Sequence, residues 1–360
     1  MAQLDFLTAY NNSEWEEAFG SCFPVPKITD KSPMKLRNFY HYTTLSNCIN
    51  NMLILHPEKC SLAKNKNNYI ELWASHFLYL NDGEELHDGL KKLFGCIAYK
   101  RKEIENSDNA EKAKMIADID NFVKQLEQIK PENISNAPNH FILCFCTNGN
   151  LLSQWKWYGR DGGIAIEFDL LNCVYDGVYS FGDLNNNEPY KTNPYAVIYD
   201  DKKKDKCINK LMNIKLHTST DVYYWAIRYI AAASLMKHQG FEEEHEVRLI
   251  FSPLYSQYES ISDSISRIKY RENDGVIKPY MKIQVKHKEE NRTPINSVTV
   301  GPGKNQQLVF NALIKLIQSR FPPKDDDYSI PEVKDHEIVP FCRYTEIGGI
   351  QVRYSTIPLR

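Results

Sequence analysis

The feature that most constrains the fold is a series of short apolar segments that begins at residue 140. The clearest of them cover residues 140–147, 163–169, 247–251, 276–285 and 297–300. Apolar runs of this length, bounded by glycine and polar residues, are typical of buried strands and are too short to span a bilayer. We therefore predict a sheet as the centre of the fold. The segment 163–169 alternates along its length, which predicts a strand there.

Helical spacing separates these strands. Ser13 and Glu16 form a capping box for a first helix, and further helices are predicted near 45–53, from 84, and over 202–216, 221–237 and 306–318. Strands are also predicted at 36–42, 69–80 and 195–199. The charged stretch 100–130 reads as a helical hairpin. The overall prediction is an α+β fold in a single large domain, 1–360, with a mixed or antiparallel central sheet, helices around it and a helical insertion at 100–137.

Charge and cysteine content narrow the class of protein. The chain has 360 residues, with 44 Lys and Arg against 46 Asp and Glu. It therefore lacks the excess of basic residues that is typical of proteins that coat nucleic acid without regard to sequence. The nine cysteines include no CxxC pair, which is typical of reduced thiols. Residues 1–20 lack the basic and apolar regions of a signal peptide. We expect a cytoplasmic protein without membrane contact.

Several common site motifs are absent. Residues 301–304 resemble the end of a phosphate loop, but Val298 and Asn305 occupy positions where that motif needs Gly and Ser or Thr. Both a plain tight turn and an anion site at the following helix remain open there. No metal-binding spacing of His and Cys occurs, so no metal is expected.

Three polar clusters remain as candidate functional residues. Each has a structural interpretation as well: an edge histidine, a helix cap or an ion-paired strand. In the third cluster, Glu244, Glu246 and Arg248 would share one face if the segment is extended. The clusters are His41, Tyr42 and Thr43; Asn81 and Asp82 with Glu84 and Glu85; and Glu244, Glu246 and Arg248.

These clusters resemble the motifs of a bacterial family catalogued as domain of unknown function 2971. The resemblance runs along nearly the whole chain, with matching motifs in the family's order. They lie at 39–43, 80–85, 143–145, 155–158, 163–169, 241–248, 300–302 and 355–360. That resemblance implies one domain but no activity.

A second resemblance implies a chemistry. The strand that ends in His41-Tyr42-Thr43, with the helix and apolar stretch behind it, is similar to the opening of ADP-ribosyltransferases. The likeness implies an ADP-ribosyltransferase-like sheet with NAD as substrate. His41 would then bind an NAD ribose, Tyr158 or Tyr79 would stack on nicotinamide, and Glu246 would bind the hydroxyl of the nicotinamide ribose. The remaining cofactor contacts would come from Tyr42, Thr43, Asn81, Asp82, Glu244 and Arg248.

Three functions therefore stay open. The first is an NAD-dependent ADP-ribosyltransferase, as a toxin or anti-phage defence effector, with an unknown protein, nucleic-acid or nucleotide acceptor and a cognate antitoxin or defence partner. The second is a non-catalytic nucleotide- or nucleic-acid-binding regulatory module, which the basic run 202–204 would allow. The third is a metal-independent nuclease or nucleotide hydrolase. Nicotinamide release from NAD separates the first from the others.

Overall fold

The computed structural model describes residues 13–24, 39–54, 69–80, 85–128, 140–159, 162–176, 179–180, 193–212, 222–252, 268–273, 275–289, 292–321, 342–347 and 349–357. The sheet strands are β1 Phe39–Thr43, β2 Ile70–His76, β3 Phe141–Cys146, β4 Ile164–Phe168, β5 Cys173–Asp176, β6 Tyr179–Ser180, β7 Tyr195–Ala196, β8 Glu246–Ser252, β9 Lys269–Asn273, β10 Val276–His287, β11 Ile295–Val300, β12 Cys342–Ile347 and β13 Ile350–Ser355.

Besides α-helices, the described residues form short stretches of π-helix and of 3₁₀-helix. The α-helices are α2 Ser13–Cys22, α3 Leu45–Asn47, α4 Glu85–Glu105, α5 Lys112–Gln128, α6 Leu152–Gln154, α7 Asp201–Met212, α8 Val222–Ala233 and α10 Gln306–Arg320. The π-helical stretches are η1 Cys48–Met52 and η4 Trp155–Gly159, and the 3₁₀ stretches are η2 Phe77–Tyr79, η5 Leu170–Asn172 and η6 Gln239–Glu244.

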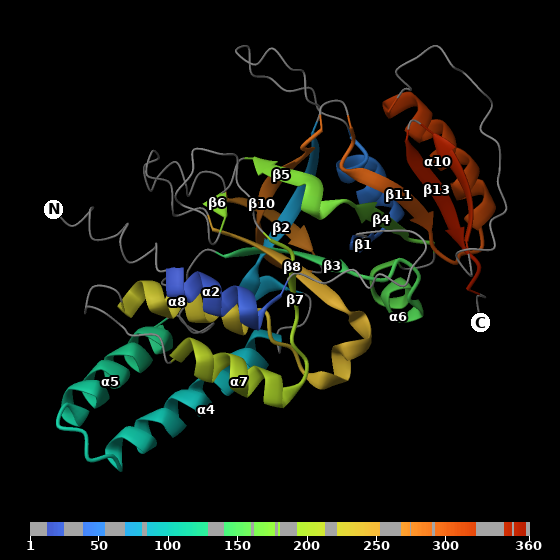
Figure 1. The fold of residues 1–360 in the computed structure, drawn as a ribbon. Helices are drawn as coiled ribbons and strands as arrows, with labels where there is room; N and C mark the ends of the chain where they lie inside the picture. The colour runs from blue at the N-terminus through green and yellow to red at the C-terminus, as the bar shows by residue number, and fades with distance from the viewer. Residues whose placement is uncertain are drawn as a thin grey trace, which may run out of the picture.

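The described strands form one 13-stranded sheet, in which the main path runs β12-β13-β11-β4-β1-β3-β2-β10-β5. Every strand pair is antiparallel except β11 with β13, which is parallel. The fold is therefore mixed α/β with a mostly antiparallel sheet, as the sequence predicted. Figure 1 shows α10 beside β11 and β13 at one end, and α2, α4, α5, α7 and α8 gathered at the other.

Strand β3 is a branch point. All six of its residues pair with β8 along one edge. Its other edge is divided, because β2 pairs with it at Phe141 and Ile142 and β1 pairs with it at Cys146. Over the residues in between, β1 and β2 separate and leave the β3 edge without a strand partner. The sheet thus opens at its middle.

Two large apolar clusters cover the sheet. One packs the sheet against α10 and includes Phe168, Ile283 and Ile317. The other packs it against the helices at the opposite end and includes Leu93 and Ala233. Strand β4 contributes to the centre, and all five of its residues are buried. The strand predicted at 163–169 is confirmed as β4, and β1 and β11 pair with its two edges.

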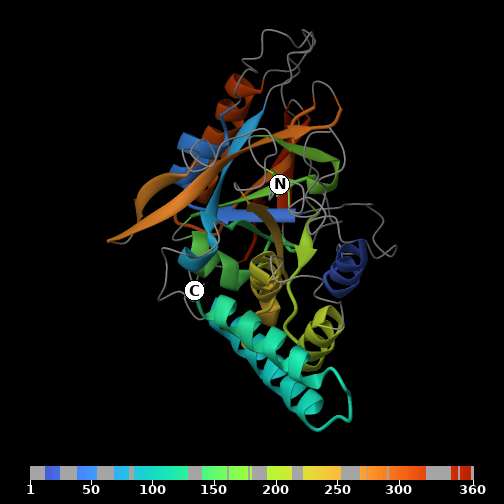
Figure 2. The same cartoon turned by 90° about the vertical axis from the view of Figure 1, so that its left-hand side faces the viewer.

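The helical hairpin is formed by α4 and α5, so it begins at Glu85, before residue 100, and ends at Gln128. Figure 2 shows it extending from the lower end of the molecule. Both helices pack on α8. Gly89 permits the close approach of α4, since a Cβ there would lie 2.2 Å from the carbonyl oxygen of Ala233. That the hairpin is an insertion within one domain stays a prediction.

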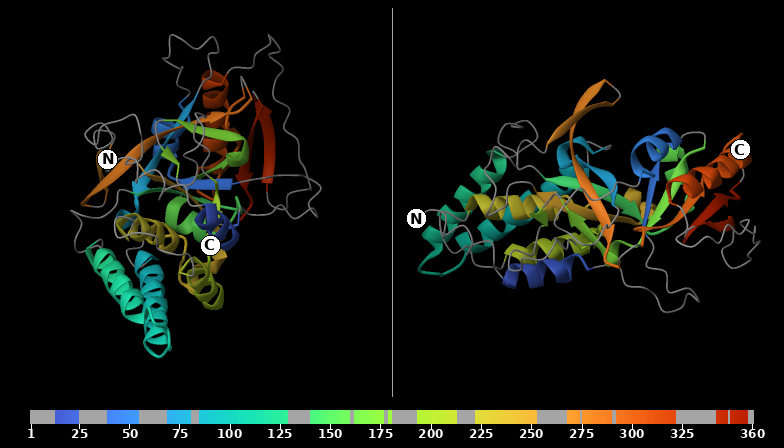
Figure 3. Two further views of the ribbon diagram at one scale, coloured as in Figure 1. Left: turned by 60° about the vertical axis from the view of Figure 1, so that its left-hand side comes forward. Right: turned by 90° about the horizontal axis from the view of Figure 1, so that it is seen from above.

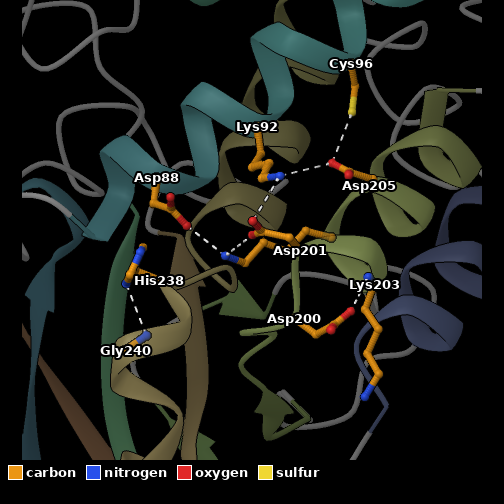
Figure 4. A network of polar contacts seen from close by, with 10 residues as sticks. Asp88, Lys92, Cys96, Asp200, Asp201, Lys203, Asp205, His238 and Gly240 are labelled. Atoms are coloured by element: carbon orange, nitrogen blue, oxygen red, sulfur yellow. Dashed lines mark hydrogen bonds and ion pairs between the residues drawn. The ribbon is translucent and has the colours of Figure 1, made fainter.

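Lys204 connects α7 to α4. Its side chain is completely buried, and its Nζ lies 2.8 Å from Asp88 Oδ2 and 3.2 Å from Asp201 Oδ1. Lys92 on α4 pairs with Asp201 and Asp205 on α7 (Figure 4). Within the basic run 202–204, this lysine is thus a packing residue and offers no charge to nucleic acid.

Some strands differ from the sequence prediction in their bounds or were not predicted. The strand predicted at 195–199 is limited to β7, with an isolated bridge from Ile198 to Met236. Strands β9, β12 and β13 were not predicted. No helix in the described part of the chain combines the length and apolarity needed to cross a membrane.

Candidate functional site

A cleft of about 1100 Å³ occupies the opening between β1 and β2. Its floor is the free edge of β3, and its walls come from β1 and η1 on one side and from β2, β9 and β10 on the other. The segments around η4 and η6 close a further side. Polar and aromatic residues that line the cleft include His41, Glu71, Trp73, Tyr79, Tyr158, Lys237, Glu243, Glu244, Glu246, Arg271 and Lys278.

His41 fills the gap that opens where β1 leaves β3. Its Nδ1–H donates to the carbonyl oxygen of Cys144 at 2.9 Å, and its ring lies edge-on to Phe145. Burial lowers the pKa of His41 below its usual 6.5, the Cys144 bond opposes that shift, and the positive charge of Arg271 adds to it. The ring is therefore neutral at pH 7, with Nε2 as a hydrogen-bond acceptor.

Glu246 is the first residue of β8, opposite Cys146 of β3. Arg248 donates hydrogen bonds to both carboxylate oxygens of Glu246, from Nε to Oε1 at 2.9 Å and from Nη2 to Oε2 at 2.8 Å. Burial of Glu246 opposes its charge, but the Arg248 and Lys237 cations outweigh burial and lower its pKa to about 2. The carboxylate is thus ionised and fixed in one orientation.

Glu244 does not lie in the strand, contrary to the extended arrangement that the sequence suggested. It ends η6, and His245 after it adopts a left-handed conformation with φ 44° before β8 begins. The turn nevertheless brings Glu244 back to the site, because Lys237 Nζ lies 2.6 Å from Glu244 Oε2 and 3.5 Å from Glu246 Oε2. The two carboxylates share one cation.

Arg248 is 1% exposed and does not line the cleft. Besides Glu246, its guanidinium donates to the carbonyl of Ser234. The resemblance to ADP-ribosyltransferases implied that this residue contacts the cofactor. Its contacts in the structure favour a different role, the orientation of the Glu246 carboxylate.

The two neighbours of His41 use their polar groups inside the protein. The Tyr42 hydroxyl donates to the Asn148 carbonyl at 2.8 Å and accepts from the Leu151 N–H at 3.0 Å. Thr43 Oγ1 accepts from Asn47 Nδ2 at 2.7 Å. Both residues border the cleft, but their hydrogen bonds shape the wall of the cleft and the start of α3.

Both predicted stacking residues lie at the cleft. Tyr158 belongs to η4, and burial, with the charge of Glu246 as a second cause, raises the pKa of its hydroxyl, which therefore stays protonated. Tyr79 belongs to η2 and has its ring edge-on to His76. Asn81, Asp82 and Glu84 lie outside the described residues, as does the side chain of Glu85.

Lys237, a second buried cation of the site beside Arg248, was not identified from the sequence. Lys237 is 2% exposed, bonds to both Glu244 and Glu246, and lies over the ring of Phe241 at 4.6 Å. A lysine next to the largely apolar segment 229–236 would ordinarily keep its ammonium in water, so the burial of Lys237 depends on its pairing with the two carboxylates.

The basic wall of the cleft was also not predicted. Arg271 and Lys278 come from β9 and β10, and Trp73 from β2 lies beside them. Strand β9 carries alternating charged residues and no apolar run, so nothing in its composition marked it as a strand. Its position becomes visible only through its pairing with β10.

The glycine turn at 301–303 has a structural role at Gly301. Its N–H donates to the Gly163 carbonyl at 2.7 Å, and a Cβ at this position would lie 2.6 Å from the Trp155 ring. That N–H is therefore not available to an anion. Among the described residues, no group of three or more His, Cys, Asp and Glu side chains is arranged to hold a metal ion.

Comparison with known proteins gives one match. The family described as "Protein of unknown function (DUF2971)" matches residues 154–249. This range contains Tyr158, Lys237 and the Glu246–Arg248 pair, whereas His41 and the basic wall lie outside it. The resemblance expected along the rest of the chain stays a prediction. No curated protein and no solved structure matches the chain.

Proposed function

We propose that the cleft binds NAD and that the protein is an ADP-ribosyltransferase, which breaks the bond between nicotinamide and ribose. The single observation that carries this proposal is the opposite charge of the two ends of one cleft. Carboxylates of Glu243, Glu244 and Glu246 line the end next to η6 and the start of β8, where Lys237 offsets one of the three charges. Arg271 and Lys278 line the part formed by β9 and β10, and the nearby Glu71 is already paired with Lys282. Such a cleft suits a ligand that carries a positive charge in one part and negative charges in another.

NAD has this charge distribution. Its nicotinamide ring is cationic, and its pyrophosphate is anionic. With nicotinamide and its ribose at the carboxylate end, the pyrophosphate would reach toward the cationic end. The aromatic side chains of Tyr158 and Tyr79 then offer faces for the nicotinamide ring. The cleft volume of about 1100 Å³ is large enough for a dinucleotide.

The proposed reaction breaks the C1′–N1 bond, and the bonding electron pair leaves with nicotinamide, which becomes neutral. Positive charge develops at C1′, and a fixed carboxylate stabilises it. The acceptor then attacks C1′ and releases a proton. Glu246 suits this role because Arg248 fixes its orientation and its low pKa keeps it ionised. Glu244, which is paired with Lys237 as Glu246 is, would bind the ribose hydroxyls.

His41 would orient the same ribose. Since Nδ1–H is committed to Cys144, the neutral ring offers Nε2 as an acceptor for a ribose hydroxyl. This role needs no proton transfer by His41. It requires only that the ring stay neutral.

The test is release of labelled nicotinamide from NAD by the purified protein, with water or added acceptors. Glu246→Gln should lower the rate by about 10²–10³-fold, the usual effect of losing one preorganised electrostatic group. Glu242→Gln is the matched control, because Glu242 is an exposed residue of η6 that does not line the cleft. Thermal melting must show that each variant is folded.

One observation favours a second function, a regulatory module that binds the nucleotide without cleaving it. Both oxygens of Glu246 are already paired with Arg248 or Lys237. These two cations reduce the stabilisation that the carboxylate can give to a positive charge that develops on the ribose. NAD binding by calorimetry, without nicotinamide release under any acceptor condition, would support that module. Absence of NAD binding would contradict both proposals.

A further inference from the structure

The hairpin of β9 and β10 projects from the body (Figures 2 and 3). Its residues Arg271 and Lys278 line the cleft. Strand register places Arg271 directly opposite Lys278, and Lys269 opposite Tyr280. Alternation along β10 puts Lys278, Tyr280 and Lys282 on the same face. This face continues onto β2, where Tyr280 pairs with Ser75 and Lys282 with Trp73.

Arg271 and Lys278 are like charges in direct cross-strand positions. Side chains in such positions lie about 5 Å apart at Cβ, and like charges there destabilise the sheet. Neither residue has a carboxylate partner within the described part of the chain. By contrast, Lys282 on the same face has one, since its Nζ lies 2.8 Å from Glu71 Oε1. Of the cations compared on this face, the two without a carboxylate partner, Arg271 and Lys278, are thus the two that line the cleft.

The guanidinium of Arg271 is held in place but not saturated. Its Nη2 donates to Ser75 Oγ at 3.0 Å, and the plane lies over the stacked rings of Trp73 and Tyr280, 5.7 and 5.6 Å from their centroids. Its Nε is buried and has no hydrogen-bond partner. A fixed arginine with an unused donor is suited to bidentate contact with an oxyanion.

We propose that Arg271 and Lys278 form a phosphate subsite that binds the pyrophosphate of a nucleotide in the cleft. This inference rests on the proposed nucleotide ligand but not on its cleavage. Arg271 would supply directed hydrogen bonds, and Lys278 would supply a second charge from the opposite strand. Trp73 and Tyr280 fix the plane of the arginine from below. A bound anion would also remove the repulsion between the two cations.

The anion would lie close to the reacting end of the cleft. Arg271 is near enough to His41 for its charge to act on the imidazole, in addition to the larger effect of burial. A pyrophosphate between these residues would place the attached ribose at His41, and from there the second half of the ligand can extend toward Glu246. The subsite therefore sets the direction in which the ligand lies.

The experiment measures binding of ADP-ribose and of adenosine by calorimetry. Arg271→Gln and Lys278→Gln should each weaken ADP-ribose binding about 10- to 100-fold, the range for losing a hydrogen bond to a charged group, while adenosine binding stays unchanged. Lys282→Gln is the matched control: it makes the same change in net charge on the same face, at a residue that already has a carboxylate partner. It should change ADP-ribose affinity less than threefold.

Two further arms separate the possible outcomes. Arg271→Lys keeps the charge but loses the planar fork, and it should recover only part of the affinity. A short single-stranded oligonucleotide tests the other source of phosphate. If the oligonucleotide requires Arg271 and Lys278 and ADP-ribose does not, or if all three charge variants weaken ADP-ribose equally, the nucleotide subsite is refuted.

Failure of this subsite and failure of the proposed reaction remain distinguishable. Glu246→Gln should lower the rate of nicotinamide release about 10²–10³-fold and leave the Arg271-dependent binding of ADP-ribose intact. Binding that depends on Arg271 without any NAD cleavage would support the subsite and refute the reaction. NAD cleavage that is unaffected by Arg271→Gln and Lys278→Gln, in KM as well as kcat, would refute the subsite alone.

Discussion

The Nδ1 of His41 lies 2.9 Å from the carbonyl oxygen of Cys144, at the point where β1 separates from β3. A side chain thus occupies a position on the β3 edge that a backbone N–H of a neighbouring strand would otherwise take. This bond links the opening of the sheet to the tautomer of the histidine that faces the cleft. It is both a structural contact and a condition for the proposed chemistry.

Replacing His41 by Phe should therefore destabilise the fold by about 1–3 kcal/mol, because the Cys144 carbonyl loses its partner. His41→Asn, which keeps a donor, should restore part of that stability. Urea denaturation of the three proteins measures the difference. Equal stability of His41→Phe and the natural protein would show that water or another group satisfies the carbonyl.

The pH dependence of His41 has a defined sign. Its folded pKa lies below 6.5, so the unfolded chain takes up the proton first as the pH falls. The stability contribution of the neutral ring is present above pH 6.5 and is lost as the pH falls from 6.5 toward the folded pKa. Denaturation between pH 7.5 and 5 should show this loss, and His41→Asn should lack it. A loss of the same size in the variant would assign the effect to another group.

The pair formed by Glu246 and Arg248 predicts strong non-additivity. Glu246→Leu leaves the buried Arg248 without its carboxylate and should cost about 3–5 kcal/mol, whereas the double variant Glu246→Leu with Arg248→Met should recover much of that loss. A double-mutant cycle in urea measures the coupling. Additive effects of the two substitutions would contradict the arrangement of this pair.

Two glycines of α4 provide a matched test of helix packing. Gly89→Ala should destabilise by about 1–3 kcal/mol, because its Cβ would overlap the Ala233 carbonyl of α8. Gly95→Ala has nothing within 4 Å of its Cβ and should instead stabilise by about 0.5–1 kcal/mol through helix propensity. Thermal melting of both variants checks the difference in sign.

Several elements could be predicted from local sequence because their signals are local. The apolar run at 140–147 became β3, and the helical spacing after residue 305 became α10. The proximity of Glu246 and Arg248 could also be predicted, since residues two apart on a strand face the same side. For Glu244 the same rule was wrong, because the left-handed His245 ends the extended segment before it.

What the sequence by itself determined was therefore the class of fold and one ion pair within the site. Tertiary structure alone decided that His41 and Glu246 border one cleft, that Lys237 joins two carboxylates, and that Arg271 opposes Lys278. The physical reason is that strand order and register depend on packing between segments distant in the chain. The branching of β3, which opens the cleft, arises from three such pairings and has no local signature.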